Sequence, residues 1–126
     1  MNAVSEVVLV VEDEPQLASI LTRSLQRQGY TVLTATDGKE GLAVAQSHGA
    51  PIDLLISDIV MPGMGGRELV WRIREIYPEI KVILCSGYAD MEGAFQLMED
   101  EAQITFVEKP VDLQELGRIV REILDE

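Results

Sequence analysis

Several short apolar segments of the chain are each followed at once by a polar side chain suited to metal or phosphoryl chemistry. The apolar run at 7–11 leads into an acidic triplet at 12–14. Later runs lead to Asp58, to Ser86 and, near the end of the chain, to Lys109. Carboxylates that gather in one place stay ionised together only when a cation or protons intervene. If these segments meet, they could form a cation site beside a hydroxyl and an ammonium group.

The chemistry that such a set supports is phosphoryl transfer to a carboxylate. Oxygen ligands suit a hard cation, and Mg²⁺ typically uses one or two carboxylates together with waters and phosphate oxygens. A lysine opposite the carboxylates supplies a second positive charge, and a hydroxyl can donate to a phosphoryl oxygen. An aspartate can itself be the nucleophile and carry an acyl phosphate. The residue types therefore predict a phosphoryl site with a carboxylate nucleophile.

Each of these residues, taken singly, also has an ordinary structural interpretation. An acid after a strand commonly caps the next helix, as Glu14 would, and Asp58 could simply begin a turn. Ser86 and Gly87 form a common turn pair, and Lys109 alone would be a surface lysine. Their coincidence at the ends of four apolar runs is poorly explained by four separate accidents, so we favour the shared site.

The order of apolar and amphipathic segments predicts five strands that alternate with five helices. An unbroken apolar run such as 7–11 is typical of a parallel strand covered on both faces. Asp37 with Glu40, and Asp112 with Glu115, have the spacing of helix caps with capping-box partners. The expected strands lie at 7–11, 31–35, 53–57, 81–85 and 104–107, and the expected helices run from 15 to a stop at Gly29, from 37 to about 47, and over 67–77, 90–101 and 112–124.

This alternation favours an α/β fold, a flavodoxin-like doubly wound parallel sheet of five strands with strand order 2-1-3-4-5 and helices on both faces. Ligands of such sheets bind outside the carboxyl ends of the strands, where the strand order reverses. The polar residues described above stand at that edge. The apolar side chains of the helices, Ile20 and Ile76 among them, are expected to face the sheet.

Composition is that of one ordinary globular domain spanning 1–126. The formal net charge of −12 argues against binding of nucleic acid or an anionic membrane by this domain. Residues 15–36 are an exception, since they carry no acid and include Arg23 and Arg27, which suits either a docking site or a solvated helix face. Cys85 is the only cysteine, and no signal peptide or membrane-length apolar run is evident, so a cytoplasmic location is expected.

The sequence resembles the response regulator receiver domain family, the phosphoacceptor domains of two-component systems. The likeness extends from Val7 to Leu124, and it looks most like receivers attached to hybrid histidine kinases. The stretches that carry it are VLVVEDEP at 8–15, ISDIVMPGMGG at 56–66, ILCSGYAD at 83–90 and FVEKPVDLQEL at 106–116.

The resemblance implies roles for the acidic residues and one backbone group. Asp58 corresponds to the phosphoacceptor, and Asp13 to a direct ligand of Mg²⁺. Glu12 corresponds to an acid that usually acts through metal-bound water. The backbone carbonyl of Val60 corresponds to the remaining protein ligand.

Three further positions match the part of the family that responds to phosphorylation. Ser86 corresponds to the switch hydroxyl, and Phe106 to the aromatic residue that rotates. Lys109 corresponds to the lysine that pairs with the phosphoryl group, and its bond to Pro110 is typically cis in the family.

The sequence departs from the common family pattern at three places. Glu12 stands where Asp is commoner, so its extra methylene alters how water reaches the metal. Gly65-Gly66 stands where a polar residue often precedes the glycine, which could loosen the loop. Phe106 stands where Tyr is frequent and has no hydroxyl to bond when it turns inward. None of these changes removes a required functional group.

The resemblance implies a signalling switch and not a turnover enzyme. Asp58 would take a phosphoryl group from a phosphohistidine on a sensor histidine kinase or a histidine phosphotransfer protein, and would lose it slowly by hydrolysis. A homodimer could form through the face made by helix 90–101, strand 104–107 and helix 112–124.

Three other functions compete with this interpretation. A flavodoxin-like carrier of a nucleotide or flavin needs a phosphate loop after the first strand, where the acidic triplet at 12–14 would repel phosphate. A phosphatase with an aspartate nucleophile would usually have D-x-D there and a longer chain. A degenerate receiver used only for protein contacts would not need Asp13, Asp58 and Lys109.

Overall fold

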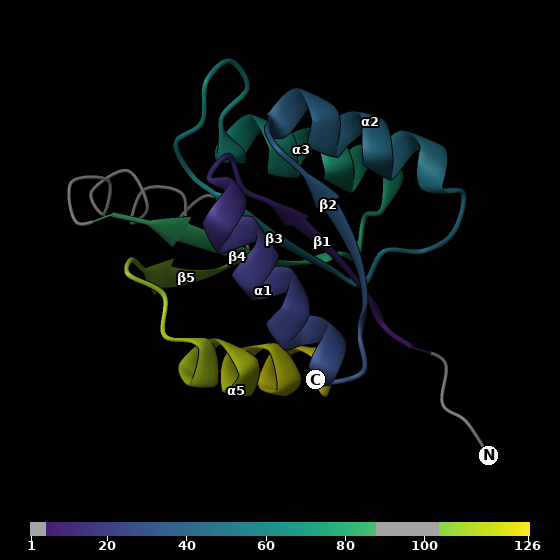
Figure 1. Cartoon of the computed structure of the whole chain (residues 1–126). Helices are drawn as coiled ribbons and strands as arrows, with labels where there is room; N and C mark the ends of the chain where they lie inside the picture. Colours follow the sequence, from purple (N-terminus) through teal and green to yellow (C-terminus); the bar gives the residue numbers. More distant parts are fainter. Residues whose placement is uncertain (1–4, 88–103) are drawn as a thin grey trace.

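One parallel sheet of five strands forms the framework of the computed structural model, which describes residues 5–87 and 104–126. The strands pair in the order β2-β1-β3-β4-β5, all parallel, which confirms the expected flavodoxin-like sheet (Figure 1). The strands are β1 (Val7–Val11), β2 (Thr31–Ala35), β3 (Leu54–Asp58), β4 (Lys81–Ser86) and β5 (Ile104–Glu108).

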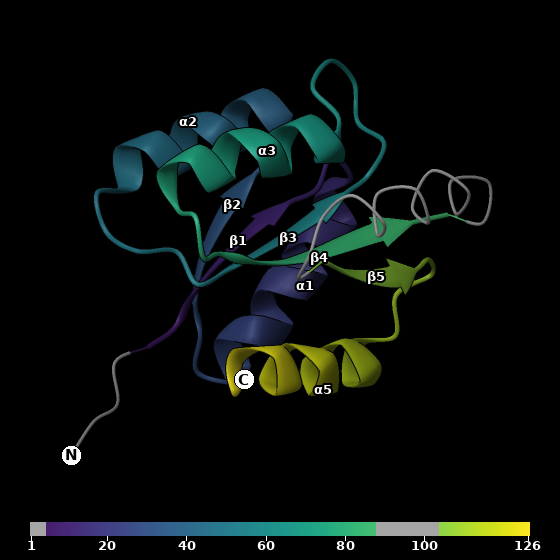
Figure 2. The same cartoon turned by 180° about the vertical axis from the view of Figure 1, so that it is seen from behind.

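Four helices in the described residues cover the two faces of this sheet. α1 (Pro15–Arg27) and α5 (Leu113–Leu124) lie on one face, and α2 (Gly38–His48) and α3 (Gly66–Ile76) lie on the other (Figures 1 and 2). The fifth helix that the sequence predicts, at 90–101, lies outside the described residues. None of the helices in the described part of the chain is long and apolar enough to span a membrane.

Alternate residues of β1, an inner strand of the sheet, enter two separate apolar cores. Leu9 and Val11 pack in the cluster with α2 and α3, whereas Val8 and Val10 pack in the cluster with α1 and α5. All four side chains are buried, which explains why the run is apolar at every position. Burial of each such side chain stabilises the fold by roughly 1.5–3 kcal/mol. The carboxyl end of β1 therefore has a fixed place in the sheet.

Side-chain caps fix the starts of α2 and α5 at the residues that the sequence predicts, whereas Glu14, at the start of α1, makes no side-chain cap bond. Asp37 Oδ1 accepts a hydrogen bond from the Glu40 N–H at 2.8 Å, and Glu40 Oε1 accepts one from the Thr36 N–H at 2.6 Å. Asp112 Oδ1 accepts from the N–H groups of Gln114 and Glu115 at 2.9 and 3.1 Å. Each cap of this kind typically stabilises a helix by about 1 kcal/mol.

Two predictions about the helices and several strand boundaries were wrong. Ile20 is 48% exposed and Ile76 is 39% exposed, because the buried stripes of α1 and α3 are narrower than the apolar patterns. β3, β4 and β5 each end one residue later than expected, so Asp58 and Ser86 still belong to the sheet, where Asp58 is paired with Cys85.

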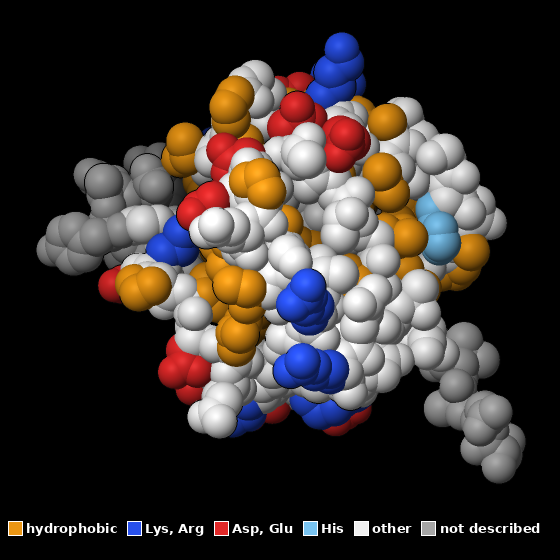
Figure 3. All heavy atoms as spheres, in the orientation of Figure 1, with side chains coloured by type: hydrophobic (Ala, Val, Ile, Leu, Met, Phe, Trp, Pro, Cys, Tyr) orange, Lys and Arg blue, Asp and Glu red, His pale blue; other side chains and the backbone are white. Residues whose placement is uncertain are grey.

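Charge is unevenly distributed over the face that carries α1. Arg23 and Arg27 are exposed on this helix, and Ile20 is exposed one turn before Arg23. Figure 3 shows basic side chains over the C-terminal half of the helix and acidic side chains gathered toward its other end, near the carboxyl ends of the strands. The basic patch predicted from the sequence is therefore a real surface feature.

Candidate functional site

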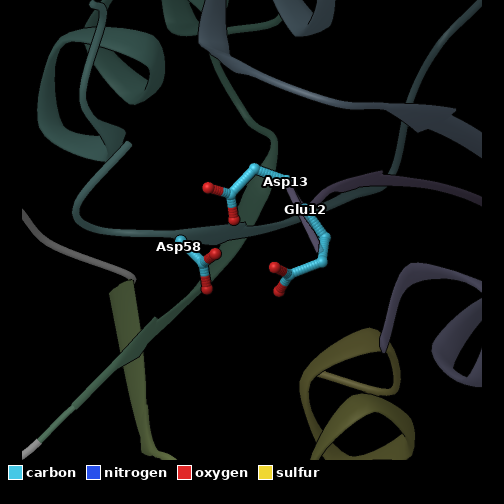
Figure 4. Close-up of side chains that lie close together, drawn as sticks. All are labelled: Glu12, Asp13 and Asp58. Atoms are coloured by element: carbon cyan, nitrogen blue, oxygen red, sulfur yellow. The ribbon is translucent and has the colours of Figure 1, made fainter. Parts of the chain in front are cut away.

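The carboxyl ends of four strands bring the predicted polar residues to one edge of the sheet. Glu12 and Asp13 directly follow β1, and Asp58 is the last residue of β3. Ser86 ends β4, and Lys109 directly follows β5. Figure 4 shows the side chains of the three acids extending toward a common space. The sequence pattern therefore identified residues that the fold brings together.

The three carboxylates are close enough to share one cation. One oxygen atom from each of Glu12, Asp13 and Asp58 lies within 4.8 Å of the other two. Glu12 and Asp58 are buried, whereas Asp13 is exposed, so one side of the cluster is open to water. A hard cation that keeps several waters fits this set of donors, and it would relieve the repulsion among the acids.

Lys109 supplies the positive charge on the other side of the cluster. Its Nζ lies 2.7 Å from Asp58 Oδ1 and 3.8 Å from Glu12 Oε1. Burial disfavours the lysine charge, but the hydrogen bond to Asp58 and its negative charge outweigh this and raise the pKa of Lys109. The Lys109 N–H donates to the Ser86 carbonyl at 2.8 Å, and the bond to Pro110 is cis, as the resemblance implies.

Glu12 is the acid whose ionisation is most affected by the site. Burial, reinforced by the nearby charge of Asp58, raises its pKa to about 7. The Glu14 N–H donates to Glu12 Oε2 at 3.1 Å, and this bond and the Lys109 charge act in the opposite direction without cancelling the effect. With its pKa near 7, Glu12 is therefore partly protonated at neutral pH.

The metal-free protein is expected to lose stability as the pH rises from about 4.5 through about 7 because of Glu12. In this range the folded state keeps a proton on Glu12 that the unfolded state releases, so rising pH favours unfolding. Glu12→Gln should remove this contribution and make the metal-free protein more stable at pH 8, by roughly 1–3 kcal/mol. Urea unfolding in a chelator at pH 5.5 and 8 measures the effect. Glu14→Gln, at an exposed neighbour, is the control, and equal pH dependence in wild type and Glu12→Gln would contradict the assignment.

Two residues of β4, Ser86 and Cys85, lie next to the cluster and differ in the chemistry that their side chains can do. Ser86 is buried at the end of the strand. Cys85 pairs with Asp58 across the sheet, and burial raises the pKa of its thiol to about 12. The thiol is therefore protonated at neutral pH, as expected of a buried hydrophobe and not of a nucleophile.

The other two predicted residues lie at the margins of the site. Phe106 of β5 pairs with Leu84, is partly buried and packs against the apolar cluster of α2 and α3. Val60 lies two residues after Asp58, and its side chain is 64% exposed. A role for Val60 in the acidic cluster would therefore have to use its backbone.

Gly66, which begins α3, holds the backbone around Asp58 in a way that the sequence does not reveal. A Cβ atom at Gly66 would lie 2.4 Å from the Asp58 carbonyl oxygen and 2.9 Å from Ile59 Cα. The Gly66 N–H also donates to the Ile59 carbonyl at 2.7 Å. The sequence suggested a loose loop at Gly65-Gly66, but the helix packs directly on the strand end. The glycine pair itself was the only available signal in the sequence.

A family comparison identifies the domain that carries this site. Residues 8–121 match the model of the response regulator receiver domain. The chain belongs to the response regulator receiver domain family. It is therefore a receiver domain of the kind found in two-component systems, as the four sequence motifs predicted.

The receiver domain is similar to parts of known signalling proteins. It is 40% identical over 121 residues to the sensor kinase CckA of Brucella abortus, which covers 96% of this chain and 13% of that protein. The crystal structure of the receiver domain from the hybrid histidine kinase CckA is 35% identical with a TM-score of 0.79, covering 94% of this chain and 98% of that one. A receiver domain structure from Clostridium thermocellum is 29% identical with a TM-score of 0.86, and the match covers 95% of this chain and 94% of that one.

The domain spans half or less of the length of the curated relatives that it matches first. These relatives include a sensor kinase and transcriptional regulatory proteins. The similarity to CckA supports the likeness to hybrid-kinase receivers that the motifs indicated.

Proposed function

We propose that this receiver domain accepts a phosphoryl group on Asp58 from a phosphohistidine on a sensor histidine kinase or a histidine phosphotransfer protein. The observation that carries the proposal is the 2.7 Å contact between Lys109 Nζ and Asp58 Oδ1, next to two further carboxylates. A buried carboxylate that faces an ammonium group and a cation site can act as nucleophile while both positive groups screen the phosphoryl oxygens.

The transfer exchanges one bond to phosphorus for another. A carboxylate oxygen of Asp58 attacks the phosphorus, and the P–O bond forms as the P–N bond to histidine breaks. The histidine nitrogen keeps the electron pair and is protonated from solvent. Later, water attacks the same phosphorus, which releases inorganic phosphate and regenerates Asp58. The domain, taken as one unit over 1–126, thus promotes only its own phosphorylation and dephosphorylation.

The residues that would hold Mg²⁺ are Asp13, Asp58 and the Val60 carbonyl directly, with Glu12 acting through water. When bound, Mg²⁺ would neutralise negative charge on the transferring phosphoryl group. Lys109 holds the Asp58 carboxylate and then pairs with a phosphoryl oxygen. The exposed position of Asp13 leaves this side of the site open to the phosphodonor.

Mg²⁺ binding is expected to depend more on Asp13 than on Glu12. Asp13→Asn removes a charge from a direct ligand and should weaken binding by roughly tenfold or more, whereas Glu12→Gln, which acts through water, should weaken it less. Isothermal titration calorimetry measures both affinities. Glu14→Gln, outside the cluster of three acids, is the matched control. Wild-type affinity in Asp13→Asn would show that Asp13 is not a ligand.

The partner should approach over α1. Arg23 and Arg27 are exposed there beside the exposed Ile20, and they lie at one end of a face whose other end leads to the acidic cluster. A phosphohistidine-bearing surface with acidic and apolar side chains would complement this patch. The overall charge of −12 disfavours nucleic acid as a partner of this domain.

The function is tested by incubating the protein with a phosphorylated histidine kinase or with acetyl phosphate. We expect a base-labile, acid-stable label of one phosphoryl group per chain that does not form when Mg²⁺ is chelated beforehand. A generic phosphomonoester should not be turned over, and the protein should carry no flavin. Failure of every kinase and of acetyl phosphate to label the folded protein would refute the proposal.

Phosphorylation should move Ser86 and Phe106 together. The Ser86 hydroxyl can donate to a phosphoryl oxygen if the end of β4 shifts toward Asp58, and this shift would open space next to β5. Phe106 is only partly buried, so turning inward would gain apolar burial of about 1–2 kcal/mol. That energy would shift the equilibrium between the conformer with Phe106 turned outward and the conformer with Phe106 turned inward by about tenfold. The altered surface would include β5 and α5, where a homodimer could form.

Ser86→Ala is expected to accept a phosphoryl group on Asp58 but to pass the resulting conformational change to β4 and β5 poorly. The variant lacks the hydroxyl that couples the phosphoryl group to β4, whereas it keeps the nucleophile and the metal ligands. NMR amide shifts of residues 88–108, with and without beryllofluoride as a phosphoryl mimic, compare the variant with wild type. Shifts confined to the Asp58 pocket in wild type, or identical distant shifts in Ser86→Ala, would refute the coupling.

A further inference from the structure

A buried hydroxyl lies behind the strand end that carries Asp58. Ser57 is 1% exposed, and its Oγ donates a hydrogen bond to the Asp58 carbonyl oxygen at 2.9 Å. The same Oγ lies 3.9 Å from the sulfur atom of Met61 in the following loop. Successive side chains of a strand point to opposite faces of the sheet, so the Ser57 hydroxyl is on the other face from the Asp58 carboxylate.

Several contacts converge on the short backbone stretch that follows this serine. The Asp58 carbonyl accepts the Ser57 hydroxyl and faces the Cα of Gly66, where no Cβ would fit. The next residue, Ile59, donates its N–H to the Cys85 carbonyl at 3.0 Å and accepts from the Gly66 N–H at 2.7 Å. The peptide that leaves Asp58 is therefore held by β4, by α3 and by the Ser57 side chain.

We propose that Ser57 is a positioning residue for phosphoryl transfer. By holding the Asp58 carbonyl, its hydroxyl sets the direction in which the Asp58 carboxylate and the backbone of Val60 leave the sheet. This inference rests on the proposed function, because it requires Asp58 to be the phosphoacceptor. Ser57 itself touches neither the phosphodonor nor the cation, so it acts only through the backbone that it holds.

Ser57→Ala should slow phosphorylation without unfolding the protein. The variant loses one hydrogen bond, and the freed peptide lets the Asp58 carboxylate depart from its productive direction. Small misplacements of reacting groups are costly, so we expect labelling by acetyl phosphate at saturating Mg²⁺ to slow roughly 5–30-fold. Amide hydrogen exchange at Gly66 in the metal-free protein should become at least about threefold faster, since its acceptor on Ile59 is less firmly held.

The experiment compares wild type with Ser57→Ala, Ser57→Thr and Ser47→Ala. Threonine keeps a hydroxyl and suits a strand, so Ser57→Thr tests for rescue. Ser47→Ala is the matched control, because the Ser47 hydroxyl also donates to a backbone carbonyl, that of Ala43 at 2.9 Å, but in α2. Labelling rate, Gly66 exchange in chelator and the thermal midpoint are measured for all four proteins.

The proposal is supported if Ser57→Ala, alone among the variants, is labelled slowly by acetyl phosphate and exchanges the Gly66 amide quickly. In the same case, both rates of Ser57→Thr should lie within about threefold of wild type. It is overturned if Ser57→Ala matches wild type within about twofold in both rates, or if Ser57→Thr is as slow as Ser57→Ala. If wild type itself takes no label, the proposed function fails and the positioning role fails with it. The metal-free exchange at Gly66 still reports separately whether the Ser57 contact holds the loop.

Discussion

Asp58→Asn should abolish phosphoryl labelling of the receiver domain, with a loss of roughly a hundredfold or more. The amide is a poor nucleophile and cannot form an acyl phosphate, although its shape matches the carboxylate. The fold should persist, because the substitution removes a negative charge from a cluster of three acids and Lys109 keeps Glu12 at 3.8 Å. The loss can therefore be assigned to the reacting group and not to unfolding.

Intact-protein mass spectrometry after treatment with acetyl phosphate measures this loss directly. Asp53→Asn is the control, since Asp53 lies just before the other end of the same strand and its Oδ2 accepts the Val7 N–H at 2.8 Å. That variant should label like wild type, because an asparagine oxygen can still accept this hydrogen bond. A stoichiometric, base-labile adduct on Asp58→Asn would show that another residue is the phosphoacceptor.

The sequence was most informative where one local property decides the structure. A strand buried on both faces must be apolar at every position, so the run at 7–11 was recognisable without any knowledge of its neighbours. The cap formed by Asp37 and Glu40 depends on residues three apart and was equally visible. Parallel strands then place their carboxyl ends at one edge, which is why Asp58 and Lys109 could be expected to meet.

Contacts between distant segments could not be predicted in this way. The Arg121 guanidinium donates to Glu6, 115 residues away, and lies 5.6 Å from the centre of the Tyr30 ring. Nothing in the local sequence around any of the three indicates this contact. The exposure of Ile20 and Ile76 has a similar cause, since a helix buries only the part of its apolar stripe that another element covers.

The packing around Asp58 was also invisible in the sequence. A glycine pair such as Gly65-Gly66 fits a flexible loop as well as a close approach of two backbones. Only the structure shows that Gly66 lies against the Asp58 carbonyl with no space for a side chain, and that Ser57 holds the same carbonyl. The residues that do the chemistry were thus easier to find than the residues that hold them in place.

Gly66→Ala should consequently be among the most damaging substitutions outside the acidic cluster. Alanine favours a helix over glycine by about 1 kcal/mol, which alone predicts stabilisation at this first residue of α3. The added Cβ, however, would lie 2.4 Å from the Asp58 carbonyl oxygen, and that atom belongs to a strand that cannot easily move. We expect a net loss of about 2–3 kcal/mol in the free energy of unfolding. Because the strand end is displaced, we also expect acetyl phosphate to label Asp58 more slowly, by about tenfold or more.

Gly117→Ala in α5 provides the matched comparison, because the atoms nearest to its added Cβ would belong to the flexible Gln28 side chain, the first at 3.0 Å. That variant should be unchanged or up to about 1 kcal/mol more stable, and should label normally. Urea unfolding in chelator and the acetyl phosphate labelling rate distinguish the two variants. If Gly66→Ala proved as stable and as reactive as Gly117→Ala, the close packing of α3 on the Asp58 backbone would not be a requirement of the site.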